Sequence, residues 1–291
     1  MAGESQGPAR YTARLLVSCA DRPGIVAAVS GFLLAQGANI VSSHQYSSDP
    51  SGGRFFLRTE FFLAPGADVD GLRRAFGGEV AGPFGMAWEM RPWGERRRMV
   101  ILVSRYDHCL LDLLWRRKRG ELQADVLAVI SNHPDLGAEV RAAGVPFHHV
   151  PVENGDMAGA ERAMLELLGQ DVELLVLARY MRILSGEFLQ GLRAPAINIH
   201  HSFLPAFAGA SPYLRAHDRG VKLIGATAHY VTEDLDEGPI IEQDVLRVDH
   251  RQSPQELERL GRDVERLVLA RAVELHLEDR VIVDGRRTVV F

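Results

Sequence analysis

The chain has 291 residues and a formal net charge of −5, with 46% hydrophobic and 24% charged residues. This length and composition indicate a globular protein with a substantial core, and they favour two domains over one. The net negative charge argues against a general nucleic-acid or membrane-surface binder, and no apolar window is long enough to span a bilayer.

The amino-terminal segment gives no indication of export. Its first ten residues are polar and include no apolar signal core. The two cysteines, Cys19 and Cys109, lie far apart and lack the spacing of metal ligands, which fits a reducing compartment. We therefore expect a cytoplasmic protein with neither nucleic acid nor membrane as a partner.

Residues 11–90 have the pattern of a small α+β domain. Asp21 is placed to cap its first helix, Pro23 suits the first turn, and Gly37 is placed to end that helix. The β-α-β-β-α-β order of the expected elements is typical of ferredoxin-like domains. Those elements are strand 12–19, helix 25–36, a hairpin of strands 39–48 and 54–61, helix 68–76 and a strand at about 80–90.

The strand at 54–61 alternates between apolar and charged residues. Its alternation predicts an antiparallel sheet that is covered on one side only. The covered face would carry Phe55, Leu57, Thr59 and Phe61, and the solvent face Arg54, Arg58 and Glu60.

Two short segments accompany this order of elements, Asp21-Arg22-Pro23-Gly24-Ile25-Val26 and Gly37-Ala38-Asn39-Ile40. Together they resemble the ACT family of small regulatory domains. The resemblance implies side-by-side pairing with an amino-acid effector at the interface, and hence a homo-oligomer, either a dimer or a tetramer. The effector contacts that it implies are Asp21, Arg22, Gly24, Asn39 and Ile40. The alternative interpretation of Asp-Arg-Pro-Gly is a helix cap without an effector.

Residues 91–98 are rich in Pro, Gly and charge and are expected to be a linker. Beyond it, in 99–291, apolar strands alternate with helices, which predicts a Rossmann-like, mostly parallel sheet covered on both faces. The expected strands are 99–104, 124–131, 145–150, 173–178 and 196–200, and the expected helices are 108–118, 135–143, 157–169, 184–192 and 211–219. An antiparallel extension (222–231 and 239–248), a long helix opened by the capping box at Ser253–Glu256, and a hairpin at 281–290 complete the domain.

The strand at 196–200 carries a polar pair. Asn198 and His200 share one face, because Ile197 and Ile199 point to the other. Ligands usually bind where the strands of such a sheet end. An Asn amide can donate to a developing oxyanion, a contribution of about 3 kcal/mol, and a His beside a carboxylate is a stronger base. Asp236 is the candidate carboxylate, although a polar strand end and a solvated acidic turn explain these residues nearly as well.

Three separated motifs bear on this choice. They are Asn198-Ile199-His200 with Ser202-Phe203-Leu204-Pro205, Leu235-Asp236-Glu237-Gly238-Pro239, and Ala178-Arg179-Tyr180-Met181-Arg182-Ile183-Leu184-Ser185. In their order along the chain (178–185, 198–205 and 235–239) they resemble the folate-dependent formyltransferase family. The resemblance implies that Asn198, His200 and Asp236 are catalytic. It also implies a folate pocket formed by Met181, Arg182, Ile183, Leu184, Thr232, Glu233 and Asp234.

The formyl acceptor is the remaining question. The loop Ser104-Arg105-Tyr106-Asp107-His108-Cys109 lacks the glycines that let a backbone hold a phosphate, and His201 stands where transferases of this family usually carry proline. Members that join an ACT domain to a formyltransferase-like domain fit the chain best, and they imply water as the acceptor.

The expected reaction is hydrolysis of 10-formyltetrahydrofolate to formate and tetrahydrofolate, which would supply formate for purine synthesis and balance the one-carbon folate pool. Neither a metal nor a cofactor is expected, because amide, imidazole and carboxylate cover the oxyanion and proton roles.

Two other functions stay open on the sequence. One is formyl transfer to an amine, and the other is an amino-acid sensor that has lost catalysis. His108, His133 and His201 receive no role, and Asn132, at the end of a strand, is a candidate for the acceptor side.

Overall fold

The computed structural model describes residues 12–64, 66–205 and 212–291. Residue 11, where the first domain is expected to begin, and residue 211 of the expected helix lie outside this part. The chain divides into two compact units. The first ends at Glu95 and also includes Asp279–Ile282 and Val289–Phe291, and the second comprises Arg96–Glu278 and Val283–Thr288. The domain limits expected from composition stay a prediction.

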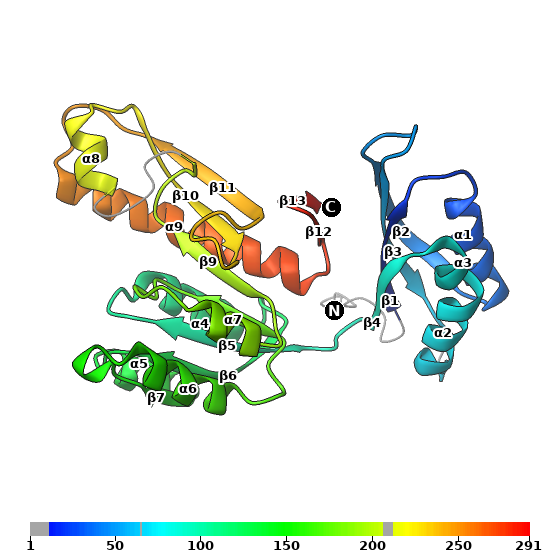
Figure 1. Ribbon diagram of the computed structural model, residues 1–291, viewed down its shortest axis with the longest axis horizontal. Helices are drawn as coiled ribbons and strands as arrows, with labels where there is room; N and C mark the ends of the chain where they lie inside the picture. Colours follow the sequence, from blue (N-terminus) through cyan, green and yellow to red (C-terminus); the bar gives the residue numbers. More distant parts are fainter. Residues whose placement is uncertain (1–11, 65, 206–211) are drawn as a thin grey trace, which may run out of the picture. The chain divides into compact units, whose positions relative to one another are not determined.

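The first unit is an antiparallel sheet in the order β2-β3-β1-β4, with helices packed on one face (Figure 1). The β-α-β-β-α-β order confirms the expected ferredoxin-like fold. Its elements are β1 (Thr12–Ala20), α1 (Ile25–Ala35), β2 (Asn39–Ser47), β3 (Arg54–Phe62), α2 (Val69–Phe76), the π-helix η1 (Gly77–Ala81), α3 (Gly82–Phe84) and β4 (Ala87–Pro92).

Two local expectations in this unit are wrong. Residues 77–84 are helical, and the last strand begins only at Ala87, because Val80 and Ala81 reach the core from the π-helix and not from a strand. Asp21 does not cap α1: Gly24, with φ 95°, holds the N-cap position, and the Asp21 carboxylate accepts a hydrogen bond from Ser47 Oγ instead.

The second face of this sheet is also partly covered, contrary to expectation. Arg58 is buried and donates from Nε to the carbonyl of Asp279, 2.8 Å away. Arg14 forms an ion pair with the Asp279 carboxylate at 3.2 Å. Charged residues on one face of a strand suggest that this face is exposed to solvent. Alternation within one strand cannot show that a segment distant in sequence covers the face and pairs with its charges.

The second unit is built on a seven-stranded sheet in the order β11-β10-β9-β8-β5-β6-β7. Strands β9 to β7 are parallel, and β10 and β11 extend the sheet in antiparallel fashion, as expected. Its elements are β5 (Arg97–Val103), α4 (His108–Arg119), β6 (Ala124–Ser131), α5 (Gly137–Ala142), β7 (Phe147–His149), the 3-10 helix η2 (Glu153–Gly155), α6 (Met157–Leu168), β8 (Leu174–Leu177), α7 (Gly186–Gly191), β9 (Ala196–His200), α8 (Pro212–Asp218), β10 (Leu223–Tyr230), β11 (Ile240–Arg247), α9 (Pro254–Leu277), β12 (Val281–Asp284) and β13 (Arg287–Val290).

The strand order creates a crevice at one edge of this sheet. After β5 the chain builds β6 and β7 on one side and then β8 and β9 on the other, so the connections leave the carboxyl ends of β5 and β8 in different directions. Ligands bind at such a switch point in open α/β sheets. Helices α6 and α7 share a core with β5, β6 and β8, whereas α9 packs against β9, β10, β11 and α4.

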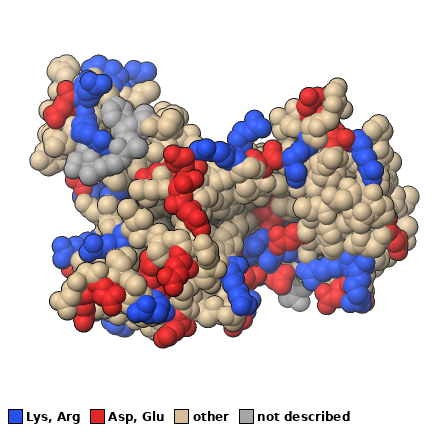
Figure 2. Space-filling view, in the orientation of Figure 1, with Lys and Arg blue, Asp and Glu red and all other residues tan. Residues whose placement is uncertain are grey.

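On the face drawn in Figure 2, basic and acidic side chains are interspersed with neutral surface. Within the described ranges, no helix is both long and apolar enough to cross a membrane.

Candidate active site

The three residues expected to be catalytic lie together. His200, at the end of β9, places Nδ1 3.2 Å from Asp236 Oδ2, and Asn198 lies two residues earlier on the same strand. All three line a cavity of about 700 Å³. The Nε2 atom of His200 is buried and has no hydrogen-bond partner among the described residues. It is therefore available to a ligand.

Asp236 is held in an unusual conformation. Its φ is 57°, in the left-handed region that non-glycine residues seldom adopt, which costs of order 1–3 kcal/mol. The contact with His200 and, after it, the neighbouring His229 ring hold the pKa of the Asp236 carboxyl well below its usual range. The carboxylate is therefore ionised at neutral pH and can accept a hydrogen bond from Nδ1–H of His200.

His229 is a fourth polar residue of the site, which our sequence interpretation missed. It pairs directly with Asn198 across β9 and β10, and its Nε2 lies 3.3 Å from the Asn198 amide nitrogen and 3.7 Å from Asp236 Oδ1. Its Nδ1 is 2.9 Å from the carbonyl of Tyr230 and so carries a proton. Nε2 can then accept from Asn198, which orients the amide. The antiparallel pairing of 222–231 with 196–200 is the signal that could have identified His229.

The segment between β8 and α7 forms one wall of the cavity and is anchored at both ends. The backbone N–H of Met181 donates to Ser104 Oγ at 3.0 Å. Ser185 caps α7 by accepting from Phe188 N at 3.1 Å, and its own N–H donates to the buried carboxylate of Glu161 at 2.8 Å. Between these anchors the wall presents three apolar side chains and one charged side chain to the cavity. They are Met181, Arg182, Ile183 and Leu184.

The acidic turn faces this wall. Thr232 and Glu233 line the same cavity, and Gln190 of α7 donates to Glu233 Oε1 at 3.0 Å. Asp234 does not line it and borders a separate cavity of about 530 Å³. The structure thus brings six of the seven expected folate-pocket residues to one cavity. Three exposed apolar side chains add a surface suited to a flat ring, namely Met181, Ile183 and Leu235.

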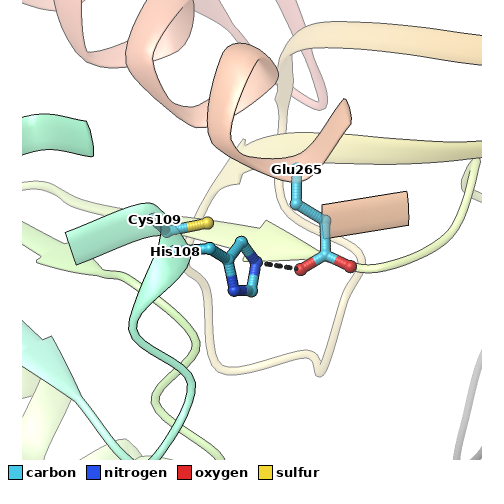
Figure 3. A group of neighbouring side chains, drawn as sticks. All are labelled: His108, Cys109 and Glu265. Atoms are coloured by element: carbon cyan, nitrogen blue, oxygen red, sulfur yellow. Dashed lines mark hydrogen bonds and ion pairs between the residues drawn. The ribbon is translucent and has the colours of Figure 1, made fainter. Parts of the chain in front are cut away.

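A buried polar cluster adjoins the cavity (Figure 3). His108, at the start of α4, places Nε2 2.8 Å from Glu265 Oε2 of α9. Arg179 Nε lies 3.3 Å from the same oxygen, and the Tyr213 hydroxyl donates to Oε1 at 2.5 Å. His108, Cys109 and Glu265 have the ligand types of a metal site, but Arg179 already balances the carboxylate charge and burial raises the pKa of the Cys109 thiol. Hydrogen bonding therefore explains this cluster.

The residues without an expected role are also placed. His201 lines the cavity, and burial, followed by the charge of Arg179, lowers its pKa to about 3. His133 lies outside that lining, and burial and Arg105 lower its pKa. Asn132 is buried, accepts from Ser104 Oγ at 2.7 Å and is not among the residues that line this cavity, so its candidate role on the acceptor side stays a prediction.

The expected effector residues of the first unit do not share one cavity. Asp21, Arg22 and Gly24 line a cavity of about 620 Å³, and Asn39 and Ile40 lie outside its lining. Arg22 donates to the carbonyl of Pro83 at 2.7 Å and stacks on the Phe84 ring at 4.1 Å.

Comparison with known families identifies both units. The family model described as Formyl transferase matches residues 97–273, and the ACT domain model matches residues 13–69. The expected pairing of an ACT domain with a formyltransferase domain is confirmed, and so is the fold class.

The chain also matches several proteins over nearly its whole length. The chain is 58% identical to formyltetrahydrofolate deformylase from Mycobacterium tuberculosis, covering 96% of this chain and 90% of that protein. It is 53% identical to the deformylase from Bacillus subtilis, over 96% and 93% of the two chains. The crystal structure of a formyltetrahydrofolate deformylase from Pseudomonas syringae matches with a TM-score of 0.93 at 48% identity, covering 99% of this chain and 96% of that one. A glycinamide ribonucleotide transformylase from Symbiobacterium toebii matches with a TM-score of 0.64 at 33% identity, over 69% and 96%.

Proposed function

Because the chain belongs to the formyltetrahydrofolate deformylase family, we propose that it hydrolyses 10-formyltetrahydrofolate to formate and tetrahydrofolate. The observation that carries the proposal is the convergence of Asn198, His200 and Asp236 at the end of β9, inside a cavity with a largely apolar wall. The product formate would feed purine synthesis, and the reaction would balance the one-carbon folate pool.

The folate would bind between the two walls of this cavity. Its pterin ring would lie against Met181–Leu184 on one side and Thr232, Glu233, Leu235 and Asp236 of the acidic turn on the other. Such binding places the formyl group on N10 beside Asn198 and His200. Positioning of this kind removes much of the entropic barrier before chemistry begins.

The catalytic step forms one bond and breaks another. Water oxygen bonds to the formyl carbon while the carbonyl oxygen becomes an oxyanion that accepts from Asn198 Nδ2 and from Nε2 of protonated His200. Asp236 accepts a hydrogen bond from Nδ1–H of His200 and thereby holds Nε2 toward the substrate. The C–N10 bond then breaks, one proton of the water passes to N10 with help from Asp236, and formic acid leaves and ionises.

Protein groups alone supply these roles, so we propose a reaction without a cofactor. We also propose that the protein is cytoplasmic and forms homo-oligomers through its ACT unit. An amino acid bound near Asp21, Arg22 and Gly24 would change turnover by binding two states of the enzyme with different affinity.

An acceptor-free assay tests the function. Purified protein is incubated with 10-formyltetrahydrofolate, with no amine present, and formate and tetrahydrofolate are quantified. The proposal predicts equal amounts of both products at a rate proportional to enzyme. If formyl groups leave only when an amine is supplied, the protein is a transferase, and if they do not leave in either case it is not a formyl-processing enzyme.

A further inference from the structure

We infer that the buried group around Glu265 determines the acceptor: it borders the cavity beside His201 and fills the space there, so that water reaches the formyl carbon and larger amines do not. This group, called here the acceptor wall, consists of Tyr106, His108, Arg179, Tyr213 and Glu265. The inference rests on the proposed function, because it concerns what attacks the formyl group.

Successive contacts connect the acceptor wall to the catalytic group, by which we mean Asn198, His200 and Asp236. The rings of His200 and His201 lie 5.3 Å apart, and the rings of His201 and Tyr213 lie 6.2 Å apart. The Tyr213 hydroxyl then donates to Glu265. Tyr106 and Arg179 line the same cavity as His200. The wall therefore begins where the catalytic group ends.

The carboxylate at the centre of the wall is already fully engaged. Glu265 is 1% exposed, accepts from His108 and Tyr213, and faces Arg179. Burial opposes its ionisation, but the hydrogen bond from His108 and the charge of Arg179 hold the pKa of Glu265 below its usual value. An incoming ammonium or amine group would have to displace these partners, and a buried charge that loses its partner is costly.

Arg179 is equally constrained. Its φ of 63° lies in the left-handed region, and its guanidinium stacks on the Tyr106 ring at 4.7 Å while facing Glu265. A strained backbone of this kind persists only where the surroundings fix it. The guanidinium is thus held in the wall by contacts on two sides.

The Tyr213 ring supplies the bulk of the barrier. A Cβ atom at Gly261 of α9 would overlap the Tyr213 hydroxyl, so only glycine lets the ring lie directly on the helix. The ring is buried there and also borders the cavity. Removal of the ring would open space next to His201 without touching Asn198, His200 or Asp236.

An amine admitted to that space could compete with water. Its nitrogen would bond to the formyl carbon, the C–N10 bond would break, and a proton from the amine would pass to N10, giving a formamide and tetrahydrofolate. The ratio of formamide to formate therefore measures how well the wall excludes amines. Because both products arise on the same enzyme, the ratio does not depend on the fraction of protein that is folded.

The test incubates wild type, Tyr213→Ala and Tyr213→Phe with 10-formyltetrahydrofolate and glycinamide, a small primary amine, and quantifies N-formylglycinamide and formate. Tyr213→Ala should raise the ratio of N-formylglycinamide to formate by about tenfold or more, which is the scale on which the size of a binding site discriminates between substrates. Tyr213→Phe keeps the ring and should stay within about twofold of wild type. Tyr213→Leu, which keeps apolar bulk against α9, should be intermediate and replaces Tyr213→Ala if the latter does not fold.

Each outcome bears on one claim. An unchanged ratio in both Tyr213→Ala and Tyr213→Leu, with formate still released, overturns the acceptor wall and leaves the hydrolase intact. A wild-type ratio as high as that of Tyr213→Ala also overturns it. Absence of formate from wild type contradicts the proposed function itself.

Discussion

At His200 the two ring nitrogens have different surroundings. Nδ1 faces Asp236, while Nε2 is buried with no partner among the described residues. The ring is thus oriented by one nitrogen and presents the other to the cavity. This asymmetry is what a proton-handling histidine requires.

Replacement of the catalytic group should therefore lower kcat. His200→Ala should reduce formate release about 10²–10⁴-fold, and Asn198→Ala about 10²–10³-fold. Asp234→Asn is the matched control for Asp236→Asn, since both lie in the acidic turn and only Asp236 lines the cavity. Steady-state formate release measures all four variants. Equal kcat for His200→Ala and wild type would remove the assignment.

His201 should make the fold more sensitive to acid. Its pKa is about 3 in the folded protein because of burial and Arg179, against an ordinary value of 6.5. Between these values the unfolded chain binds a proton that the folded protein does not, so stability falls as pH drops from 6.5 toward 3. His201→Asn should lessen this loss, as measured by urea midpoints at several pH values. His217→Asn controls for replacing an exposed histidine, and parallel pH curves for wild type and His201→Asn would contradict the prediction.

Individual site residues were predictable to different degrees. Alternation along 196–200 places Asn198 and His200 on one face, and the acidic turn offers Asp236 as the carboxylate. The resemblance then implies a catalytic role for all three. His229 and Glu265 were missed, because each acts through a neighbour on another element and has no motif of its own. Contacts between distant elements depend on strand pairing and helix packing, which residue patterns do not specify.

At the scale of elements, the wall at 181–184 depends on the anchors at its two ends. Ser185 both caps α7 and contacts Glu161. Ser185→Ala should lower the free energy of unfolding by about 1 kcal/mol. It should also raise KM for the folate more than it changes kcat, because in the proposed function this wall contacts the pterin ring and not the reacting carbon.

The control for this variant is another helix cap. Asp68 caps α2 in the first unit by accepting from Gly71 N at 2.9 Å. Asp68→Ala should cost similar stability and leave KM unchanged. The interpretation of the wall at 181–184 as a folate-binding segment fails if the two variants raise KM equally, or if Ser185→Ala leaves KM unaltered.

Most elements of both units follow from periodicity and capping signals. The strands 124–131 and 196–200 and the capping box at Ser253 agree with the structure. Residues 80–84, the end of the helical stretch at 77–84, were interpreted as the start of a strand, because short apolar runs do not distinguish the two. Packing against the core determines whether such a segment forms a helix or a strand.

At the scale of the whole molecule, the carboxyl-terminal segment contributes to both units. Asp279, next after the last residue of the second unit's main segment, is 1% exposed and pairs with Arg14. Asp279→Ala would leave the Arg14 charge buried without this partner and should destabilise the first unit by about 3–5 kcal/mol. Chemical denaturation followed by tryptophan fluorescence measures this loss, since Arg14 lies over the ring of Trp93, one of the three tryptophans.

An exposed ion pair provides the comparison. Asp249 pairs with Arg251 at 2.6 Å on the surface, and Asp249→Ala should have little effect because solvent screens such pairs. Equal stability of Asp279→Ala and Asp249→Ala would show that the buried pair does not hold the segment. The pattern of strands and helices placed 279–291 in the domain 99–291, and nothing in that stretch of sequence signals the pairing of Asp279 with Arg14.

Isotope transfer from water to formate tests the central claim most directly, namely that water is the acceptor at this site. The enzyme is supplied with 10-formyltetrahydrofolate in ¹⁸O-labelled water without any amine, and the formate is analysed by mass spectrometry. We predict enzyme-dependent formate in which one oxygen comes from the water and the other from the formyl group. Formate that carries no label, or no formate until an amine is added, would contradict the account.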